Sequence, residues 1–154
     1  DFDRFLGETE PDLLHVHHLD GHSATLPGVA RRRGVPVVFQ IHDLWPLCAR
    51  ADLHDADGGA CSGPSPLKCA RCRPLTGLRP GGLLNPALHA IRASLMRRAL
   101  AAERLVVSSS LLARTGVGAG WLPGLTPVEV LPIGIPAGRI EEIYAEVLRP
   151  RGPG

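Results

Sequence analysis

The strongest indication of the fold is the stretch Val35-Pro36-Val37-Val38-Phe39-Gln40-Ile41, which is followed directly by His42-Asp43-Leu44-Trp45-Pro46-Leu47-Cys48. The first seven residues are almost continuously apolar, which is typical of a strand covered on both faces of a sheet. A loop with an imidazole, an indole and a thiol begins where this strand ends. Ligands bind at the carboxyl ends of strands in open α/β sheets. We therefore interpret His42 as a candidate site residue, against the alternative of a half-buried, hydrogen-bonded histidine beside a core tryptophan.

Apolar strands and amphipathic helices alternate along the rest of the chain. The alternation predicts an α/β fold with a doubly wound parallel sheet. The longest helix carries an apolar stripe at helical spacing, formed by Leu84, Leu88, Ile91, Leu95 and Leu100. Strands are expected at residues 13–17, 35–41, 104–107 and 127–131, and helices at residues 23–33, 83–102, from 108 onward, and 139–148.

A long loop, residues 43–82, separates the second strand from the longest helix. It holds five prolines and six glycines and shows no helical periodicity. Loops of this length in compact domains are functional, disordered or stapled. Its four cysteines, Cys48, Cys61, Cys69 and Cys72, end in a Cys-x-x-Cys pair, which predicts a closed structural zinc site rather than a catalytic metal. Disulfides, an iron–sulfur cluster and unligated thiols are the alternatives.

A histidine cluster surrounds the end of the first expected strand, and includes His15, His17, His18 and His22. A His-x-His-x-Asp-His pattern after a strand binds two metal ions in metallohydrolases, but Leu19 stands where the aspartate belongs. The other interpretation is that His15 and His17 are hydrogen-bonded side chains near the ligand-binding edge. The serines at 108–110 lie at a strand-to-helix junction, where they cap a helix or bind an anion.

Composition and charge argue against several classes of protein. A net charge of +2 is too small to indicate nucleic-acid binding. No apolar run is long enough to span a membrane, and no signal segment opens the chain. Cysteines without a secretory signal favour a reducing, cytoplasmic setting. We expect a piece of a longer protein, because the chain begins at Asp1 and ends in Arg-Gly-Pro-Gly.

Several segments match one known family in order and spacing. They are Pro11-Asp12-Leu13-Leu14-His15-Val16-His17, Gly34-Val35-Pro36-Val37-Val38 leading into His42-Asp43-Leu44-Trp45, Arg104-Leu105-Val106-Val107 with Ser110-Leu111-Leu112, and Val130-Leu131-Pro132-Ile133-Gly134-Ile135. Together they resemble the N-terminal domain of family 4 glycosyltransferases, retaining enzymes with two Rossmann-like domains. A subset of that family is similar in the cysteine loop as well. Ile133 departs from the family, which has asparagine there.

The resemblance implies transfer of a sugar from a nucleotide-sugar donor to an acceptor hydroxyl with retention. His42 would be the catalytic residue beside the donor sugar, and His17, Asp43, Trp45 and Ser110 would bind substrate. It implies no catalytic metal, so a zinc ion on the cysteines would shape the acceptor-side loop. Lipid-linked acceptors in this family make peripheral contact with the inner membrane face an expectation.

The resemblance also implies a domain organisation. Residues 1–136 would form the Rossmann-like acceptor-side domain, with the cysteine loop at 43–82 and the family's first strand missing before Asp1. Residues 137–154 would be a helix and tail leading toward a nucleotide-binding domain, without which the chain is expected to be inactive. A non-enzymatic alternative is a zinc-stabilised module whose cysteine loop binds a protein.

Overall fold

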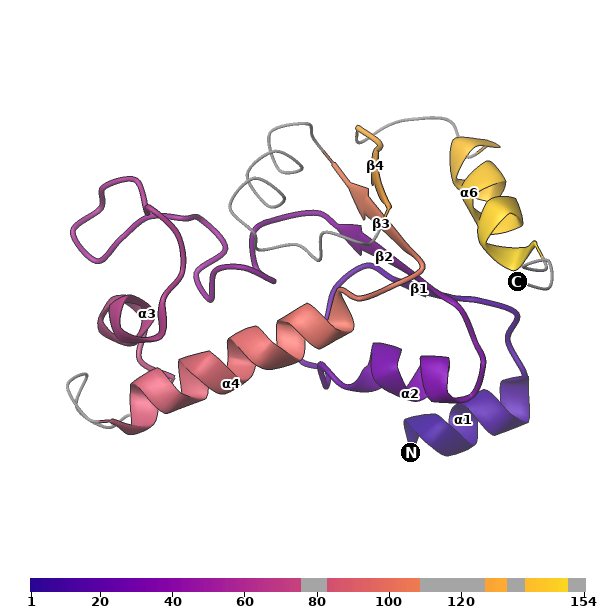
Figure 1. Cartoon of the computed structure of the whole chain (residues 1–154), viewed down its shortest axis with the longest axis horizontal. Helices are drawn as coiled ribbons and strands as arrows, with labels where there is room; N and C mark the ends of the chain where they lie inside the picture. Colours follow the sequence, from indigo (N-terminus) through magenta and orange to yellow (C-terminus); the bar gives the residue numbers. More distant parts are fainter. Residues whose placement is uncertain (76–82, 109–126, 133–137, 150–154) are drawn as a thin grey trace.

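The computed structural model describes residues 1–75, 83–108, 127–132 and 138–149 (Figure 1). Four parallel strands form one sheet in the order β1-β2-β3-β4. Their bounds are Leu14–Val16 for β1, Val37–Ile41 for β2, Arg104–Val107 for β3 and Val128–Val130 for β4. Each expected strand is therefore present, and the parallel α/β architecture is confirmed.

Helices cover both faces of this sheet. The helices α1 (Phe2–Thr9), α2 (Leu26–Arg32) and α4 (Leu84–Ala99) lie on one side, and α6 (Gly138–Leu148) lies on the other (Figure 1). A short helix, α3 (Pro66–Cys72), packs on α4 away from the sheet. The sheet is thus doubly wound, and α3 with α4 forms an extension at one end.

Alternation along β2 sends its side chains into two separate cores. Phe39 and Ile41 pack with residues of α1, α2 and α4, whereas Val38 packs with Val106 of β3 and Ile143 of α6. All five side chains are at most 1% exposed. Burial on both faces explains why the sequence of β2 is nearly continuous in apolar residues rather than alternating.

The turn from α2 into β2 follows from Gly34. Its φ of +76° is a left-handed conformation that glycine adopts without steric cost. The Gly34 amide donates to the carbonyl of Arg31, and the Val35 amide donates to the carbonyl of Ala30. These two bonds are the Schellman pattern that closes helix C-termini, so the chain leaves α2 at a fixed angle and enters β2.

Two helices were not expected from the sequence. The prediction that residues 43–82 lack helix was wrong, because α3 lies within them. Its start carries a local signal: the Ser65 hydroxyl accepts a bond from the Lys68 amide, and Pro66 occupies the first turn. In α1, Asp1 caps the first turn in the same way by accepting from the Asp3 amide.

Of the expected apolar stripe of α4, only Leu100 at its end is fully buried, and the rest of the stripe lies off the face that the helix buries. Leu84 is 49% exposed and Ile91 is 55% exposed. The buried positions of α4 are Asn85, His89, Met96 and Ala99. They lie on a different face of the helix from Leu84 and Ile91. The helix α3 and the cysteine loop pack over this face, which includes polar residues. The periodicity of the leucines could not indicate that packing.

Some expectations lie outside the described residues. These are the helix expected from residue 108 onward, which includes Ser110, and the turn at Ile133. Among the described helices, none combines the length and apolar character needed to cross a membrane.

The packing of α6 yields a stability prediction. Ile143 is fully buried against Val38 and Val106, so Ile143→Ala should lower the free energy of unfolding by about 2–4 kcal/mol through lost contacts and a residual cavity. Ile91→Ala is the matched control: the same substitution at a 55% exposed position should change it by less than about 0.5 kcal/mol. Urea unfolding measures both, and equal effects would contradict the described packing.

Candidate functional site

Polar side chains follow three adjacent strands at the same edge of the sheet. His17 follows β1, His42 follows β2 and Ser108 follows β3. Because the strands are parallel and neighbouring, their carboxyl ends meet. The Ser108 hydroxyl donates to the backbone carbonyl of His42 over 3.4 Å, which ties the third strand end to the second. The sequence predicts a ligand site at this edge of the sheet.

The two histidines at this edge form a direct pair. His17 Nδ1 lies 3.0 Å from His42 Nε2, and the rings are stacked with centroids 5.3 Å apart. Both side chains are exposed. A hydrogen bond between these nitrogens requires a proton on one of them and none on the other, so protonation of both nitrogens would break the bond and set two cations against each other. Partial burial and electrostatic repulsion from His42 lower the pKa of His17, which favours the neutral form of His17.

A second pair lies deeper along β1. His15 Nδ1 is 2.5 Å from the Tyr144 hydroxyl of α6, and its ring centroid is 4.1 Å from that of His17. Burial lowers the pKa of His15 to about 4, and the neighbouring His17 and His42 add to the shift. Burial raises the pKa of Tyr144. Tyr144, His15, His17 and His42 thus follow one another from α6 to the open edge.

The loop after His42 is held in place by Trp45. The indole ring lies 5.0 Å from the His18 ring and 4.8 Å from the Arg92 guanidinium of α4, a cation–π distance. Arg92 also donates to the backbone carbonyls of Trp45 and Pro46. An Asp43 carboxylate oxygen accepts from the Trp45 amide at 2.7 Å, and the other lies 3.5 Å from His18 Nε2.

The four cysteines come together around one small cavity. Cys48, Cys61, Cys69 and Cys72 all line a space of about 20 Å³, and all are free thiols. Burial raises the pKa of the Cys69 thiol, and the other three sulfur groups act in the same direction. The Cys61 and Cys72 thiols donate to backbone carbonyls at 3.5 Å. In this arrangement, no three histidine, cysteine or acidic side chains of the described ranges are grouped closely enough to hold one metal ion.

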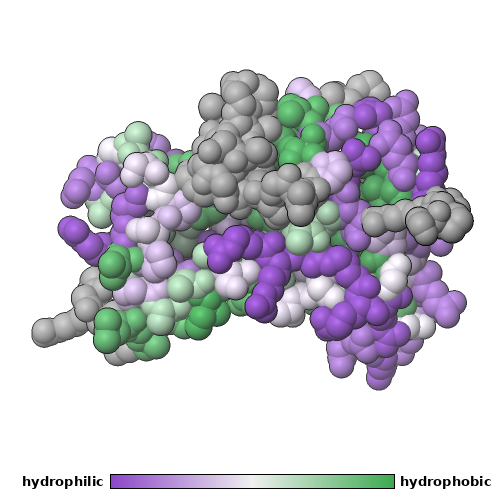
Figure 2. Space-filling model, viewed as in Figure 1, coloured by the Kyte–Doolittle hydropathy of each residue, from purple (hydrophilic) through white to green (hydrophobic). Residues whose placement is uncertain are grey.

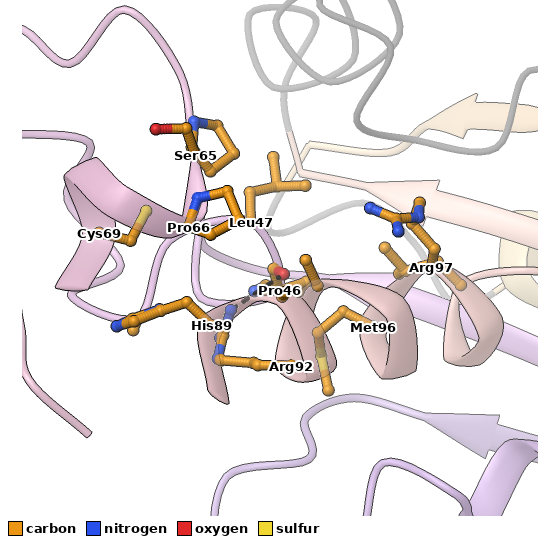
Figure 3. Close-up of a pocket in the computed structure, with 14 residues that line it drawn as sticks. Pro46, Leu47, Ser65, Pro66, Cys69, His89, Arg92, Met96 and Arg97 are labelled. Atoms are coloured by element: carbon orange, nitrogen blue, oxygen red, sulfur yellow. Dashed lines mark hydrogen bonds between the residues drawn. The ribbon is translucent and has the colours of Figure 1, made fainter. Parts of the chain in front are cut away.

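A larger cavity of about 250 Å³ separates the cysteine loop from α4 (Figure 3). Pro46, Leu47 and Pro66 form one wall, and Met96 forms part of the other. Two polar lining groups already have partners: His89 Nε2 is bonded to the Arg73 carbonyl, and Arg92 is bonded to Trp45 and Pro46. Cys69 lines both cavities, so the larger cavity adjoins the thiols and lies apart from the histidine pair.

The structure gathers most of the expected site residues but in two groups. His17, His42 and Asp43 lie at the strand edge, Trp45 connects that edge to α4, and the cysteines form the second group. Sequence reasoning did not find Tyr144, the one tyrosine of the chain. Its contact with His15 could be recognised only once the position of α6 was known, because Tyr144 follows the buried Ile143 on the helix face that meets the sheet.

A comparison with protein-family models matches Glycosyltransferase Family 4 over residues 1–139. The chain belongs to this family. No curated protein and no solved structure gave a significant match. Membership of this family supports a glycosyltransferase, whose partners in general are a sugar donor and an acceptor.

The buried His15 gives a pH prediction. Its pKa of about 4 in the fold is below the value of about 6.5 in an unfolded chain, so stability is lost as the pH falls from 6.5 toward 4. After allowance for screening of this half-buried group, the loss is about 1–2 kcal/mol. His15→Asn should remove this part of the pH dependence, measured by urea unfolding at a series of pH values. The exposed control His22→Asn should retain it, and parallel curves for wild type and His15→Asn would contradict the assignment.

Proposed function

We propose that this chain is the acceptor-side domain of a retaining glycosyltransferase that uses a nucleotide-sugar donor. Family membership supports sugar transfer. The structural observation that supports the proposal most directly is the His17–His42 pair at the open edge of the sheet. A second domain would bind the nucleotide, so the 154 residues alone would not complete the reaction. The transferred sugar would lie over this edge, with the acceptor hydroxyl brought from the side of the loop after His42.

His42 would act on the donor sugar through one defined nitrogen. His17 occupies Nε2 of His42, so Nδ1 is the nitrogen left for a substrate oxygen. Transfer with retention passes through an oxocarbenium-like transition state, which positioned polar groups stabilise by meeting the developing charge. An imidazole held in a fixed orientation supplies a hydrogen bond there. His17 would be a positioning residue that holds the ring.

Asp43 and Trp45 would shape the acceptor side. The Asp43 carboxylate fixes the turn by accepting from the Trp45 amide, and Arg92 holds the indole against α4. A fixed aromatic surface next to the strand edge suits stacking against a sugar ring. Ser110 remains a proposed substrate-binding residue from the family resemblance.

Two other interpretations are less well supported. A metallohydrolase would need a full set of metal ligands around His15 and His17, yet Leu19 stands where the aspartate of that pattern belongs, and no three metal-binding side chains of the described residues are grouped closely enough to hold an ion. A pure interaction module would leave the pairing of His17 with His42 without a role. Membership of a glycosyltransferase family favours catalysis of transfer over both.

We propose further that the four cysteines bind one structural zinc ion. Four thiols around one small cavity are the donor set of a closed tetrahedral site. Binding would bring their sulfur atoms together on the cavity they already line. Arg50, 3.8 Å from the Cys72 sulfur, would offset part of the thiolate charge. The ion would hold the loop, and free thiols suit a reducing cytoplasm.

Activity tests the first proposal. In the protein that includes the nucleotide-binding domain, His42→Ala should lower kcat/KM for sugar transfer about 100-fold, the loss of a strong transition-state hydrogen bond. His17→Ala should lower it about tenfold, and His17→Asn, which keeps a donor group, should restore part. A radiolabelled nucleotide-sugar panel measures transfer. The exposed control His54→Ala should match wild type, and an unchanged His42→Ala would contradict the role.

Metal analysis tests the second proposal. Protein purified without chelator should contain one zinc ion per chain, as in other closed four-thiolate sites, and Cys69→Ser and Cys72→Ser should each lose it. Chelation should lower the melting temperature of wild type but not of these variants. Ser62→Ala, a hydroxyl variant in the same loop, should keep the metal. Four rapidly titrating thiols and no zinc in native protein would contradict a metal site.

A further inference from the structure

We propose that Tyr144 is a positioning residue for sugar transfer, and that it acts on the His17–His42 pair through His15. The Tyr144 hydroxyl fixes the His15 ring, the His15 ring packs on His17, and His17 holds His42. The inference rests on the proposed role of His42. It adds a residue of α6 that lies beyond residue 139, where the family match ends.

The helix α6 is anchored where it crosses the sheet. Ile143 is fully buried in the core between the helix and the sheet. Partly buried ion pairs join α6 to two strands: Arg139 lies 2.6 Å from Glu129 of β4, and Glu146 lies 2.7 Å from Arg104 of β3. Hydrophilic residues cover much of the outer surface of α6 (Figure 2). The side chains on the inner face of this helix are therefore held at fixed places against the sheet.

Alternation along the strands places three histidines on the face that α6 covers. His15 lies opposite Val38, whose side chain packs with α6. Side chains two residues apart along a strand share a face. His17 after β1 and His42 after β2 continue this face beyond the strand ends. Tyr144 contacts the innermost ring, and the row ends at the exposed His42.

The bond to Tyr144 selects one orientation of the His15 ring. His15 Nδ1 lies 2.5 Å from the Tyr144 hydroxyl, and a half-turn of the ring about its Cβ–Cγ bond would put a carbon atom there instead. Burial lowers the pKa of His15 to about 4 and raises the pKa of Tyr144. Both groups are therefore uncharged near neutral pH, and the contact between them is a directional hydrogen bond rather than an ion pair.

The orientation of His15 sets the space that is left for His17. The two ring centroids are 4.1 Å apart, and the ring planes are tilted by 34°. An imidazole is thin across its face and wide across its edge, so a turned His15 ring would displace the His17 ring in a close-packed site. Such a displacement would disturb the 3.0 Å contact between His17 Nδ1 and His42 Nε2. Misplacement of a group that acts on the substrate lowers the rate of reaction.

Packing alone does not require polar side chains at these two positions. An apolar pair of similar size would fill the same space without removing a phenol hydroxyl and an imidazole from water, which costs free energy. The hydrogen bond between Tyr144 and His15 offsets that cost. It adds direction, which an apolar pair would lack.

Tyr144→Phe tests this role, because it removes the hydroxyl and keeps the ring. In the protein that includes the nucleotide-binding domain, with isotope-labelled histidines, the ring-nitrogen NMR signals of His17 and His42 should shift toward those of a free imidazole that exchanges between tautomers. We expect kcat for sugar transfer to fall about fivefold, with KM for the donor changed by less than about twofold. In a His15→Asn background, Tyr144→Phe should have no further effect on kcat.

Val147→Ala is the matched control, since it removes apolar contacts from the same face of α6. It should leave the histidine signals and kcat as in wild type. Unchanged signals and kcat in Tyr144→Phe, equal changes in Val147→Ala, or an equal loss of kcat in the His15→Asn background would each overturn the inference. Wild-type transfer by His42→Ala would overturn the proposed function and this inference with it. Impaired transfer by His42→Ala beside a fully active Tyr144→Phe would overturn this inference alone.

Discussion

The parallel pairing of β1 with β2 is the constraint on which the site depends. Its register sets Leu14 opposite Val37 and Val16 opposite Phe39, so the residues that follow the two strands emerge side by side. The same register brings His17 within hydrogen-bond distance of His42. A shift of one residue would send the alternate side chains to the opposite face of the sheet, and both the core around Phe39 and the histidine pair would be lost together.

Much of the fold could be predicted from the sequence because β2 is buried on both faces and is therefore a nearly continuous apolar run. The strand ends, and hence the position of His42, follow from that run and from Gly34 before it. The family resemblance carried by these segments agrees with the family match. The proximity of His17 to His42 is a consequence of parallel neighbours, which the alternation of strands and helices already predicts.

The remainder depends on tertiary contacts that local patterns do not contain. The buried face of α4 includes Asn85 and His89, because the cysteine loop supplies partners for polar groups there, as the His89 bond to the Arg73 carbonyl illustrates. Tyr144 reaches His15 across 129 positions of sequence. The short α3 was hidden within a loop rich in proline and glycine, although Ser65 and Pro66 are ordinary helix-start residues.

The position of Tyr144 has a practical meaning for how the domain is delimited. The helix α6 lies last in the described chain, yet it closes one core through Ile143 and holds the innermost histidine through the neighbouring tyrosine. A recombinant version cut just before Gly138 would expose Val38 and Val106 to water and release His15 from its hydroxyl partner. The cut would therefore damage the sheet behind the edge that carries His17 and His42, so expression boundaries belong beyond Leu148.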